Sequence, residues 1–104
     1  MVPATPLGKG FRIGPWRVEP QLSRLVLGSR ESPLEPKVMA VLVYLAEREG
    51  SLVTREELEQ AVWAGRVVSY DVVTGAIQKL RKALNDNPRA PHFIETRPKK
   101  GYRL

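Results

Sequence analysis

The sequence predicts an α+β domain in which a small N-terminal antiparallel sheet is followed by three helices and a C-terminal β-hairpin. Two observations support this architecture. Apolar and polar residues alternate near both ends of the chain, whereas the region between them carries apolar residues at helical spacing. With 104 residues and no cysteine, the chain is large enough for one modest core and holds neither disulfides nor thiolate metal sites.

Short strands are expected after a disordered N-terminal stretch, residues 1–10, which lacks the apolar segment of a signal peptide. Each strand alternates apolar and polar residues, and turn formers separate the strands. The strands cover residues 11–13, 16–19 and 24–27, with a fourth short strand that includes Leu34. Gly14-Pro15 would form the turn of the first hairpin. The expected role of these strands is to cover one side of a helical core.

Two amphipathic helices are expected next. The first begins near Pro36, which the first turn of a helix accepts, and ends before Gly50. Its apolar stripe consists of Leu34, Val38, Val41, Leu42 and Leu45. The second helix follows Thr54, which forms a capping box with Glu57. Its inward residues are expected to be Leu58, Ala61 and Val62, with Trp63 at its end.

The third helix, expected over about residues 70–84, has two faces that require different surroundings. One face is apolar and contains Val73, Ile77, Leu80 and Leu84, flanked by Val72, Ala76 and Ala83. The opposite arc is polar and cationic and contains Thr74, Gly75, Gln78, Lys79 and Lys82, with Arg81 on its border. No acid follows Asp71 in this helix, so the arc lacks the counter-charges of an ordinary solvated helix. A negatively charged partner such as nucleic acid is expected, and a solvated basic face is the alternative.

The net charge of +6 lies entirely in the C-terminal part of the chain. Residues 1–62 contain eight basic and eight acidic residues, whereas residues 63–104 contain nine basic residues against three acidic ones. A basic half beside a balanced half is typical of proteins that bind nucleic acid by releasing counterions from phosphates.

The chain ends in a predicted hairpin with a basic tip. Residues 92–96 form its first strand, 97–101 its turn and 102–104 its returning strand. Three helices followed by such a hairpin describe a winged helix-turn-helix over residues 11–104. In that fold the second helix braces the third, the third enters the major groove of double-stranded DNA, and the hairpin, or wing, reaches the adjacent backbone or minor groove.

Several spaced motifs identify a family. They are LEPK at 34–37, GSLVTREEL at 50–58, Trp63, VTGAIQKLRKAL at 73–84, Asp86, FIET at 93–96 and GYRL at 101–104. Together they resemble the C-terminal DNA-binding domain of OmpR/PhoB-type transcriptional regulators, and the resemblance covers about residues 11–104. It implies sequence-specific binding of DNA by a bacterial transcription regulator.

The wing indicates one branch of that family. It reads RPKKGY at 97–102 where response regulators carry roughly V-R-G-x-G-Y, and this pattern is similar to that of CadC/ToxR-like regulators. In that branch the DNA-binding domain is N-terminal and a sensor domain follows. The resemblance thus implies signal transduction, a cytoplasmic location and a membrane connection only through a segment beyond Leu104.

The resemblance also implies DNA contacts from the third helix. Thr74 and Gln78 are the candidates for base edges, and Gly75 would let the backbone approach closely. Phosphate contacts, which position the helix without reading sequence, are expected from Lys79, Arg81 and Lys82. Arg81 could instead pair with an acid of the second helix.

The wing supplies a second set of expected contacts. Pro98 stands where response regulators carry a wing arginine, which removes that arginine as a candidate. The expected substitutes on the DNA backbone are Arg97, Lys99 and Lys100.

Three further residues have both a structural and a DNA-binding interpretation. Trp63 and Tyr102 are either core residues or backbone contacts. Thr54 is a helix cap, and the helix N-terminus that it caps is also a phosphate site. The loop at 64–69 corresponds to a segment that touches RNA polymerase in relatives, so a contact of this kind is a further expectation.

Other classes of protein fit the sequence less well. The single histidine, His92, has no cysteine or acid at the spacing of a catalytic triad or a metal site. The sequence also contains no glycine-rich phosphate loop. We therefore expect that the protein is not an enzyme and that it binds no cofactor and no metal. A winged helix that binds another protein instead of DNA is the better alternative. That alternative requires an apolar patch where this chain carries lysines.

The isolated domain is expected to be monomeric, because its apolar stripes are all needed for one core. Two copies would pair on DNA, on half-sites about one helical turn apart. The longest apolar run, residues 38–46, is far shorter than the roughly 20 residues that span a bilayer.

Overall fold

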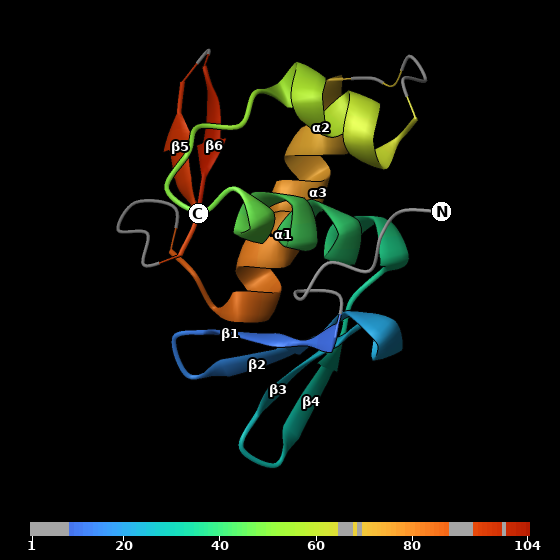
Figure 1. Ribbon diagram of the computed structural model, residues 1–104, viewed down its shortest axis with the longest axis vertical. Coiled ribbons are helices and arrows are strands. Elements are labelled where there is room, and N and C mark those ends of the chain that lie inside the picture. Colours follow the sequence, from blue (N-terminus) through green and yellow to red (C-terminus); the bar gives the residue numbers. More distant parts are fainter. Residues whose placement is uncertain (1–8, 65–67, 69, 88–92, 99) are drawn as a thin grey trace.

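The computed structural model describes residues 9–64, 68, 70–87, 93–98 and 100–104, and it forms a winged helix (Figure 1). The strands are β1 (Phe11–Ile13), β2 (Trp16–Glu19), β3 (Arg24–Leu27), β4 (Arg30–Pro33), β5 (Glu95–Arg97) and β6 (Gly101–Arg103). The helices are α1 (Pro36–Glu47), α2 (Arg55–Val62) and α3 (Tyr70–Leu84). Figure 1 shows α1 crossing α3, with the N-terminal sheet below them and α2 and the hairpin above. None of the described helices has the length and hydropathy needed to cross a membrane.

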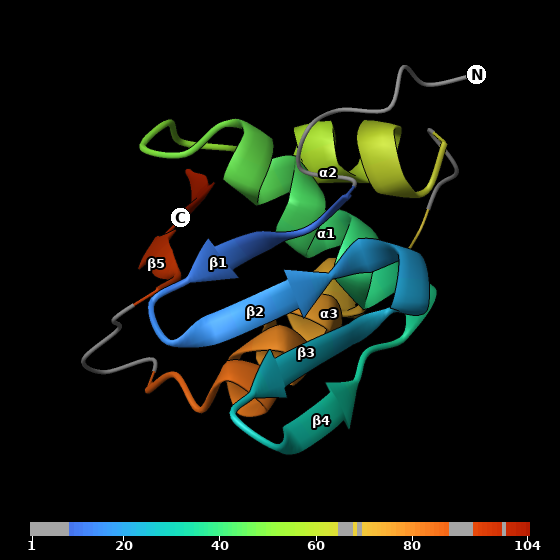
Figure 2. The same ribbon diagram turned by 60° about the horizontal axis from the view of Figure 1, so that its bottom comes forward.

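The N-terminal sheet is an antiparallel meander with the strand order β1-β2-β3-β4. One face carries the buried residues Ile13, Trp16, Val18 and Leu25, because alternate residues of a strand point to the same side. Figure 2 shows this sheet lying across α1 and α3. The sheet therefore covers one side of the helical core, as its alternating sequence predicts.

The fourth strand differs from its prediction, because β4 ends at Pro33 and excludes Leu34. Ser23 holds Leu34 instead: the Leu34 amide donates to the Ser23 carbonyl at 2.8 Å, and the Ser23 hydroxyl donates to the Leu34 carbonyl at 2.6 Å. These two bonds turn the chain out of the sheet and into α1. Of the N-terminal stretch expected to be disordered, residues 1–8 lie outside the described residues.

The three helices share one core. The apolar stripe predicted for α1 is buried, and the capping box of α2 is present, with Glu57 N donating to Thr54 Oγ1 at 3.0 Å and Thr54 N to Glu57 Oε1 at 3.4 Å. Two expected core residues are wrong: Ala61 is exposed, and Val72 is 38% exposed. Each lies one residue before a fully inward position, which places it about 100° away around the helix.

The wing is the hairpin of β5 and β6, in which Glu95 pairs with Arg103 and Arg97 with Gly101. The first strand was expected at 92–96, but β5 begins at Glu95 and extends to Arg97, while position 92 lies outside the described residues. β6 is correspondingly Gly101–Arg103 rather than 102–104. The shift follows from a tighter turn, which the Lys100 amide closes by donating to the Arg97 carbonyl at 3.0 Å.

β6 is anchored to the segment that precedes α2. The Val53 amide donates to the Tyr102 carbonyl at 2.7 Å, and the Tyr102 amide donates to the Val53 carbonyl at 2.8 Å. This pairing brings the backbones so close that a Cβ on Gly101 would lie 2.1 Å from the Val53 carbonyl oxygen. Gly101 also has φ +149°, which other residues rarely adopt. Position 101 therefore requires glycine.

Gly101→Ala is expected to destabilise the domain by at least about 2 kcal/mol, because the new Cβ would overlap the Val53 carbonyl and the backbone would be strained. Urea unfolding followed by tryptophan fluorescence measures the loss. Gly28→Ala is the matched control, since Gly28 also has a positive φ but its Cβ would meet no atom within 4 Å. Its loss should be about 1 kcal/mol, and equal losses in the two variants would contradict the role of the Val53 contact.

Candidate nucleic-acid interface

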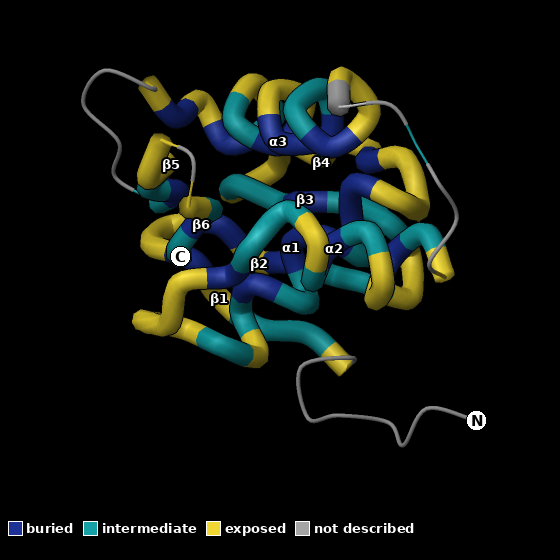
Figure 3. Tube along the Cα trace, turned by 90° about the horizontal axis from the view of Figure 1, so that it is seen from above, coloured by how far each residue is buried: buried dark blue, intermediate teal, exposed yellow. Residues whose placement is uncertain are grey.

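The outward arc of α3 is the centre of the candidate interface. Gln78, Lys79 and Lys82 are exposed, while Val73, Ile77 and Leu80 on the other side of the helix are at most 1% exposed. Figure 3 shows the exposed segments of α3 along one side of the molecule, with β5 next to them. The amphipathic sequence of α3 thus directs its polar arc to the surface, as predicted.

Gly75 and Thr74 lie near the middle of this arc and are both partly buried. A Cβ on Gly75 would meet nothing within 4 Å, so the space above the helix backbone is open there. The Oγ1 atom of Thr74 is buried and has no hydrogen-bond partner among the described residues. The exposed part of Thr74 is therefore not its hydroxyl oxygen.

The lysines of the arc differ in whether they form an ion pair within the protein. Lys79 forms an ion pair with Glu35, the residue before α1, with Nζ 3.0 Å and 3.2 Å from the two carboxylate oxygens. Both side chains are about 60% exposed (60% and 63%), so the pair is weak and water-accessible. Within the described part of the chain, Lys82 makes no ion pair. Sequence reasoning missed Glu35, because it lies 44 residues from Lys79.

Arg81 is directed toward the wing. Its Nη2 donates to the Ile94 carbonyl at 3.0 Å and also to the Thr96 hydroxyl. The alternative expectation, an ion pair with an acid of the second helix, is not observed among the described residues. Arg81 therefore connects α3 to the hairpin.

Asp86 has a structural role that sequence reasoning missed. It is buried, at 6% exposed, and its carboxylate accepts hydrogen bonds from the amides of Phe93 at 3.3 Å and Ile94 at 3.0 Å. Asn85 ends α3 with φ +56° in the left-handed region, a common conformation at the C-terminal end of a helix. The sequence motif that contains Asp86 did not reveal that its carboxylate turns inward.

The outer face of the wing is held by ion pairs around Glu95. Arg97 Nε lies 2.9 Å from its carboxylate, and Arg103 Nη2 lies 2.5 Å and 3.0 Å from the two oxygens. The hydrogen bond from Arg103, followed by the charges of Arg103 and Arg97, lowers the pKa of Glu95 below its ordinary value. Arg97 is therefore partly neutralised, whereas Lys100 at the tip is exposed.

The remaining candidates divide between core and surface. Tyr102 is 9% exposed, so its ring belongs to the core, and Trp63 is partly buried against that core. Thr54 caps α2 with its hydroxyl. Lys99 and most of the loop at 64–69, namely residues 65–67 and 69, lie outside the described residues.

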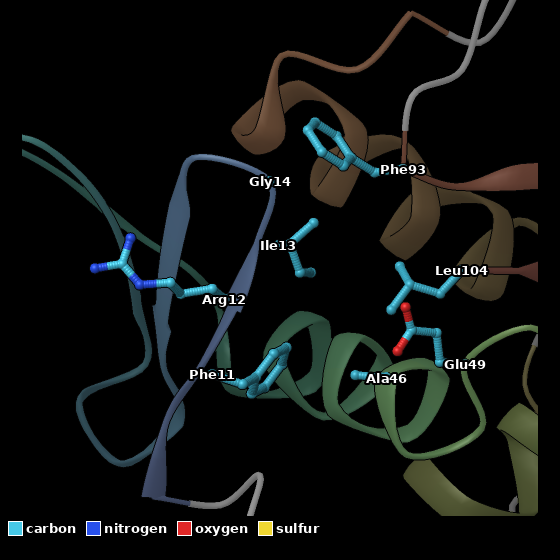
Figure 4. Close-up of a pocket in the computed structure, with 8 residues that line it drawn as sticks. All are labelled: Phe11, Arg12, Ile13, Gly14, Ala46, Glu49, Phe93 and Leu104. Atoms are coloured by element: carbon cyan, nitrogen blue, oxygen red, sulfur yellow. The ribbon is translucent and has the colours of Figure 1, made fainter.

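A separate pocket of about 400 Å³ lies between β1, the end of α1 and the C-terminal residue (Figure 4). Its lining includes the apolar residues Phe11, Ile13, Phe93 and Leu104. Figure 4 shows the Arg12 guanidinium pointing away from the other lining side chains. The pocket shares no residue with the outward arc of α3.

Comparison with known proteins identifies the family of the chain. Residues 29–104 match the family described as "Transcriptional regulatory protein, C terminal". The transcriptional activator CadC of Escherichia coli is 39% identical over 94 residues, which cover 89% of this chain and 18% of CadC. The cholera toxin homolog transcriptional activator of Vibrio parahaemolyticus is 42% identical over 80 residues, covering 75% of this chain and 25% of that protein. The chain thus spans a quarter or less of the length of these curated relatives.

Solved structures with the same fold include DNA-binding domains. The DNA-binding domain of E. coli CadC has a TM-score of 0.79 and 37% identity, and the match covers 89% of this chain and 88% of that one. The Klebsiella pneumoniae RstA DNA-binding domain, crystallised in complex with the RstA box, has a TM-score of 0.77 and 30% identity, covering 92% of this chain and 96% of that one. The chain therefore belongs to the OmpR/PhoB-type family of transcriptional regulatory protein C-terminal domains.

Proposed function

We propose that this domain binds double-stranded DNA with sequence preference, as the DNA-binding part of a bacterial transcription regulator. The observation that carries the proposal is the open arc of α3, in which Gln78 and Lys82 are exposed beside a cation-tipped hairpin. An amide and lysines on one helix face suit the edges of bases and the flanking phosphates of a major groove. Related domains of known structure support the same function.

In this proposal α3 occupies the major groove. Gln78 reads a base edge, because an exposed carboxamide can bond adenine through two hydrogen bonds. Gly75 lets the edge of the groove approach the helix backbone. Thr74 contributes an apolar contact with a thymine methyl group, because its hydroxyl oxygen is buried. Lys82 and Lys79 contact phosphates, with Lys79 exchanging Glu35 for a phosphate.

The wing lies on the adjacent backbone or minor groove. Lys99 and Lys100 supply charge at its tip, and Arg97 supplies less because Glu95 already pairs with it. The capped N-terminus of α2 at Thr54 offers backbone amides to a phosphate. Trp63 and Tyr102 contribute mainly through the core, which leaves only the Trp63 indole N–H and the Tyr102 hydroxyl for the DNA backbone.

The setting of the domain in a longer regulator is part of the same proposal. Since the chain spans a quarter or less of its curated relatives, the signal is sensed elsewhere in such a protein. We place this domain in the cytoplasm, where the DNA is, with any membrane connection through a segment beyond Leu104. The loop at 64–69 is the proposed contact with RNA polymerase.

Gln78→Ala is expected to weaken binding to the preferred site by about 1–3 kcal/mol while leaving affinity for random duplexes nearly unchanged, because only base readout is lost. Fluorescence anisotropy with the two duplexes at one salt concentration measures both affinities. Gln60→Ala, which removes an exposed carboxamide from α2, should change neither. Equal weakening on both duplexes would show that Gln78 positions the helix and does not read sequence.

Replacing both Lys99 and Lys100 with alanine should lower affinity similarly on specific and random DNA. The slope of log K against log salt should fall by about 2, because one condensed counterion is released for roughly each phosphate contact. Arg30→Ala, which removes an exposed charge from the first residue of β4, should leave the slope unchanged, because β4 and the wing lie at opposite ends of the molecule in Figure 1. If the double variant also keeps the parent slope, the wing tip points into solvent.

The isolated domain should sediment as a monomer at micromolar concentration and pair only on DNA that carries two half-sites. Its exposed large apolar residues within the described chain, Leu22, Leu52 and Val72, lie on three different segments and form no continuous stripe in the sequence. Analytical ultracentrifugation with and without a two-site duplex tests this. A tight dimer of the free domain is the contradicting result.

A further inference from the structure

Two residues at and just after the end of α3 bind the backbone N–H and C=O of Ile94, the residue that precedes β5. Arg81 Nη2 donates to the Ile94 carbonyl at 3.0 Å, while the Asp86 carboxylate accepts the Ile94 amide at 3.0 Å. Arg81 and Asp86 lie close together at the end of the helix, because the Asp86 amide donates to the Arg81 carbonyl at 2.8 Å. The Ile94 side chain is fully buried, at 0% exposed. Residue 94 is thus fixed through its N–H, its C=O and its side chain.

A third contact fixes the direction of β5. Arg81 Nη2 also donates to the hydroxyl of Thr96, two residues further along the strand. Arg81 therefore contacts the chain at two points that are two residues apart, the Ile94 carbonyl and the Thr96 hydroxyl. Arg81 and Asp86 therefore restrain both the position of β5 and its angle to the helix.

Within the described residues, Arg81 and Asp86 connect the start of the hairpin to the end of α3. β6 is anchored elsewhere, by Val53 before α2. A two-stranded hairpin with three-residue strands is marginally stable by itself. The distance between the arc of α3 and the wing tip thus depends on the contacts of Arg81 and Asp86.

The chemistry of Arg81 also favours a positioning role. Its Nε is buried and has no partner among the described residues, and its charge is not matched by an ion pair there. Leaving a buried donor unpaired costs stability, so an apolar side chain would serve the core better. The guanidinium is suited to spanning from the helix to the strand, because it is planar and long.

We propose that Arg81 and Asp86 are positioning residues that set the wing relative to α3, so that one rigid unit reaches the major groove and the neighbouring backbone together. The inference rests on the proposed function, and it assigns Arg81 a different role from Lys82. A preorganised second contact adds affinity because the hairpin loses little freedom on binding. When the contacts of Arg81 and Asp86 are removed, the distance and angle between the wing and α3 vary, and the wing no longer contacts the DNA at a defined position.

The first test needs no DNA and exploits the absence of native cysteine. Spin labels on Lys82→Cys and Lys100→Cys report the distance between α3 and the wing tip by pulsed electron paramagnetic resonance. The distribution should be narrow in the parent and broader when Asp86→Asn or Thr96→Val is added. Thr96 is exposed, so Thr96→Val keeps the domain folded even if Asp86→Asn proves destabilising. An unchanged distribution in the folded variants would overturn the inference.

The second test asks whether the same residues act on DNA through the wing. Asp86→Asn removes a negative charge, so a charge effect alone predicts equal or tighter binding to DNA, whereas a displaced wing predicts weaker binding. Asp71→Asn is the matched control, because it makes the same charge change at an exposed position on α3. Tighter binding by both variants would overturn the inference.

A double-mutant cycle completes this test. Lys100→Ala should lower the salt slope by about 1 in the parent and by almost nothing in the Asp86→Asn or Thr96→Val background. Equal effects in all backgrounds, or no effect of Lys100→Ala in the parent, would overturn the inference. A parent that binds no duplex at all would instead refute the proposed function, while the spin-label distances would still report on Arg81 and Asp86.

Discussion

Burial of one stripe of α3 is the constraint on which the rest of the structure depends. Val73, Ile77, Leu80 and Leu84 are each at most 1% exposed, and both α1 and α2 pack against this helix. Full burial of an aliphatic side chain contributes about 1.5–3 kcal/mol, so the stripe determines the rotation of α3 about its axis. The polar arc is outward because the stripe is inward. The chemistry of the surface and the stability of the core are therefore two consequences of one helix.

The wing illustrates how a small element is stabilised by attachment. Its strands are too short to be stable alone, and its own ion pairs around Glu95 are exposed enough to be weak. Stability comes from the fully buried Ile94, the largely buried Tyr102 and the backbone pairing with Val53. Asp86 adds a buried carboxylate that satisfies two amides. The hairpin is thus an extension of the core that carries cations at its outer end.

Internal pairing reduces the charge that this surface offers to a partner. Among the described cations of the basic half, Lys79 pairs with Glu35, and Arg97 and Arg103 pair with Glu95. Arg81 is engaged by the wing backbone. Lys82 and Lys100 are exposed and make no ion pair within the described residues. The number of basic residues therefore overstates the positive charge that this surface has free for a partner.

Sequence alone determined the elements whose signals are local: the helical spacing of apolar residues, the capping box at Thr54, the end of the third helix near residue 84 and the cationic arc. It did not determine that Arg81 and Asp86 hold Ile94, that Glu35 pairs with Lys79, or that Val53 leaves no space for a side chain at position 101. These contacts join segments that are distant in the chain or turn a side chain inward from a loop. Helical spacing predicts which face of a helix is apolar. Which backbone carbonyl or carboxylate lies within hydrogen-bonding distance of each cation depends on how the elements pack in three dimensions. That is why the basic surface could be predicted from the sequence, whereas the division of its cations between the open surface and contacts within the protein depends on the tertiary structure.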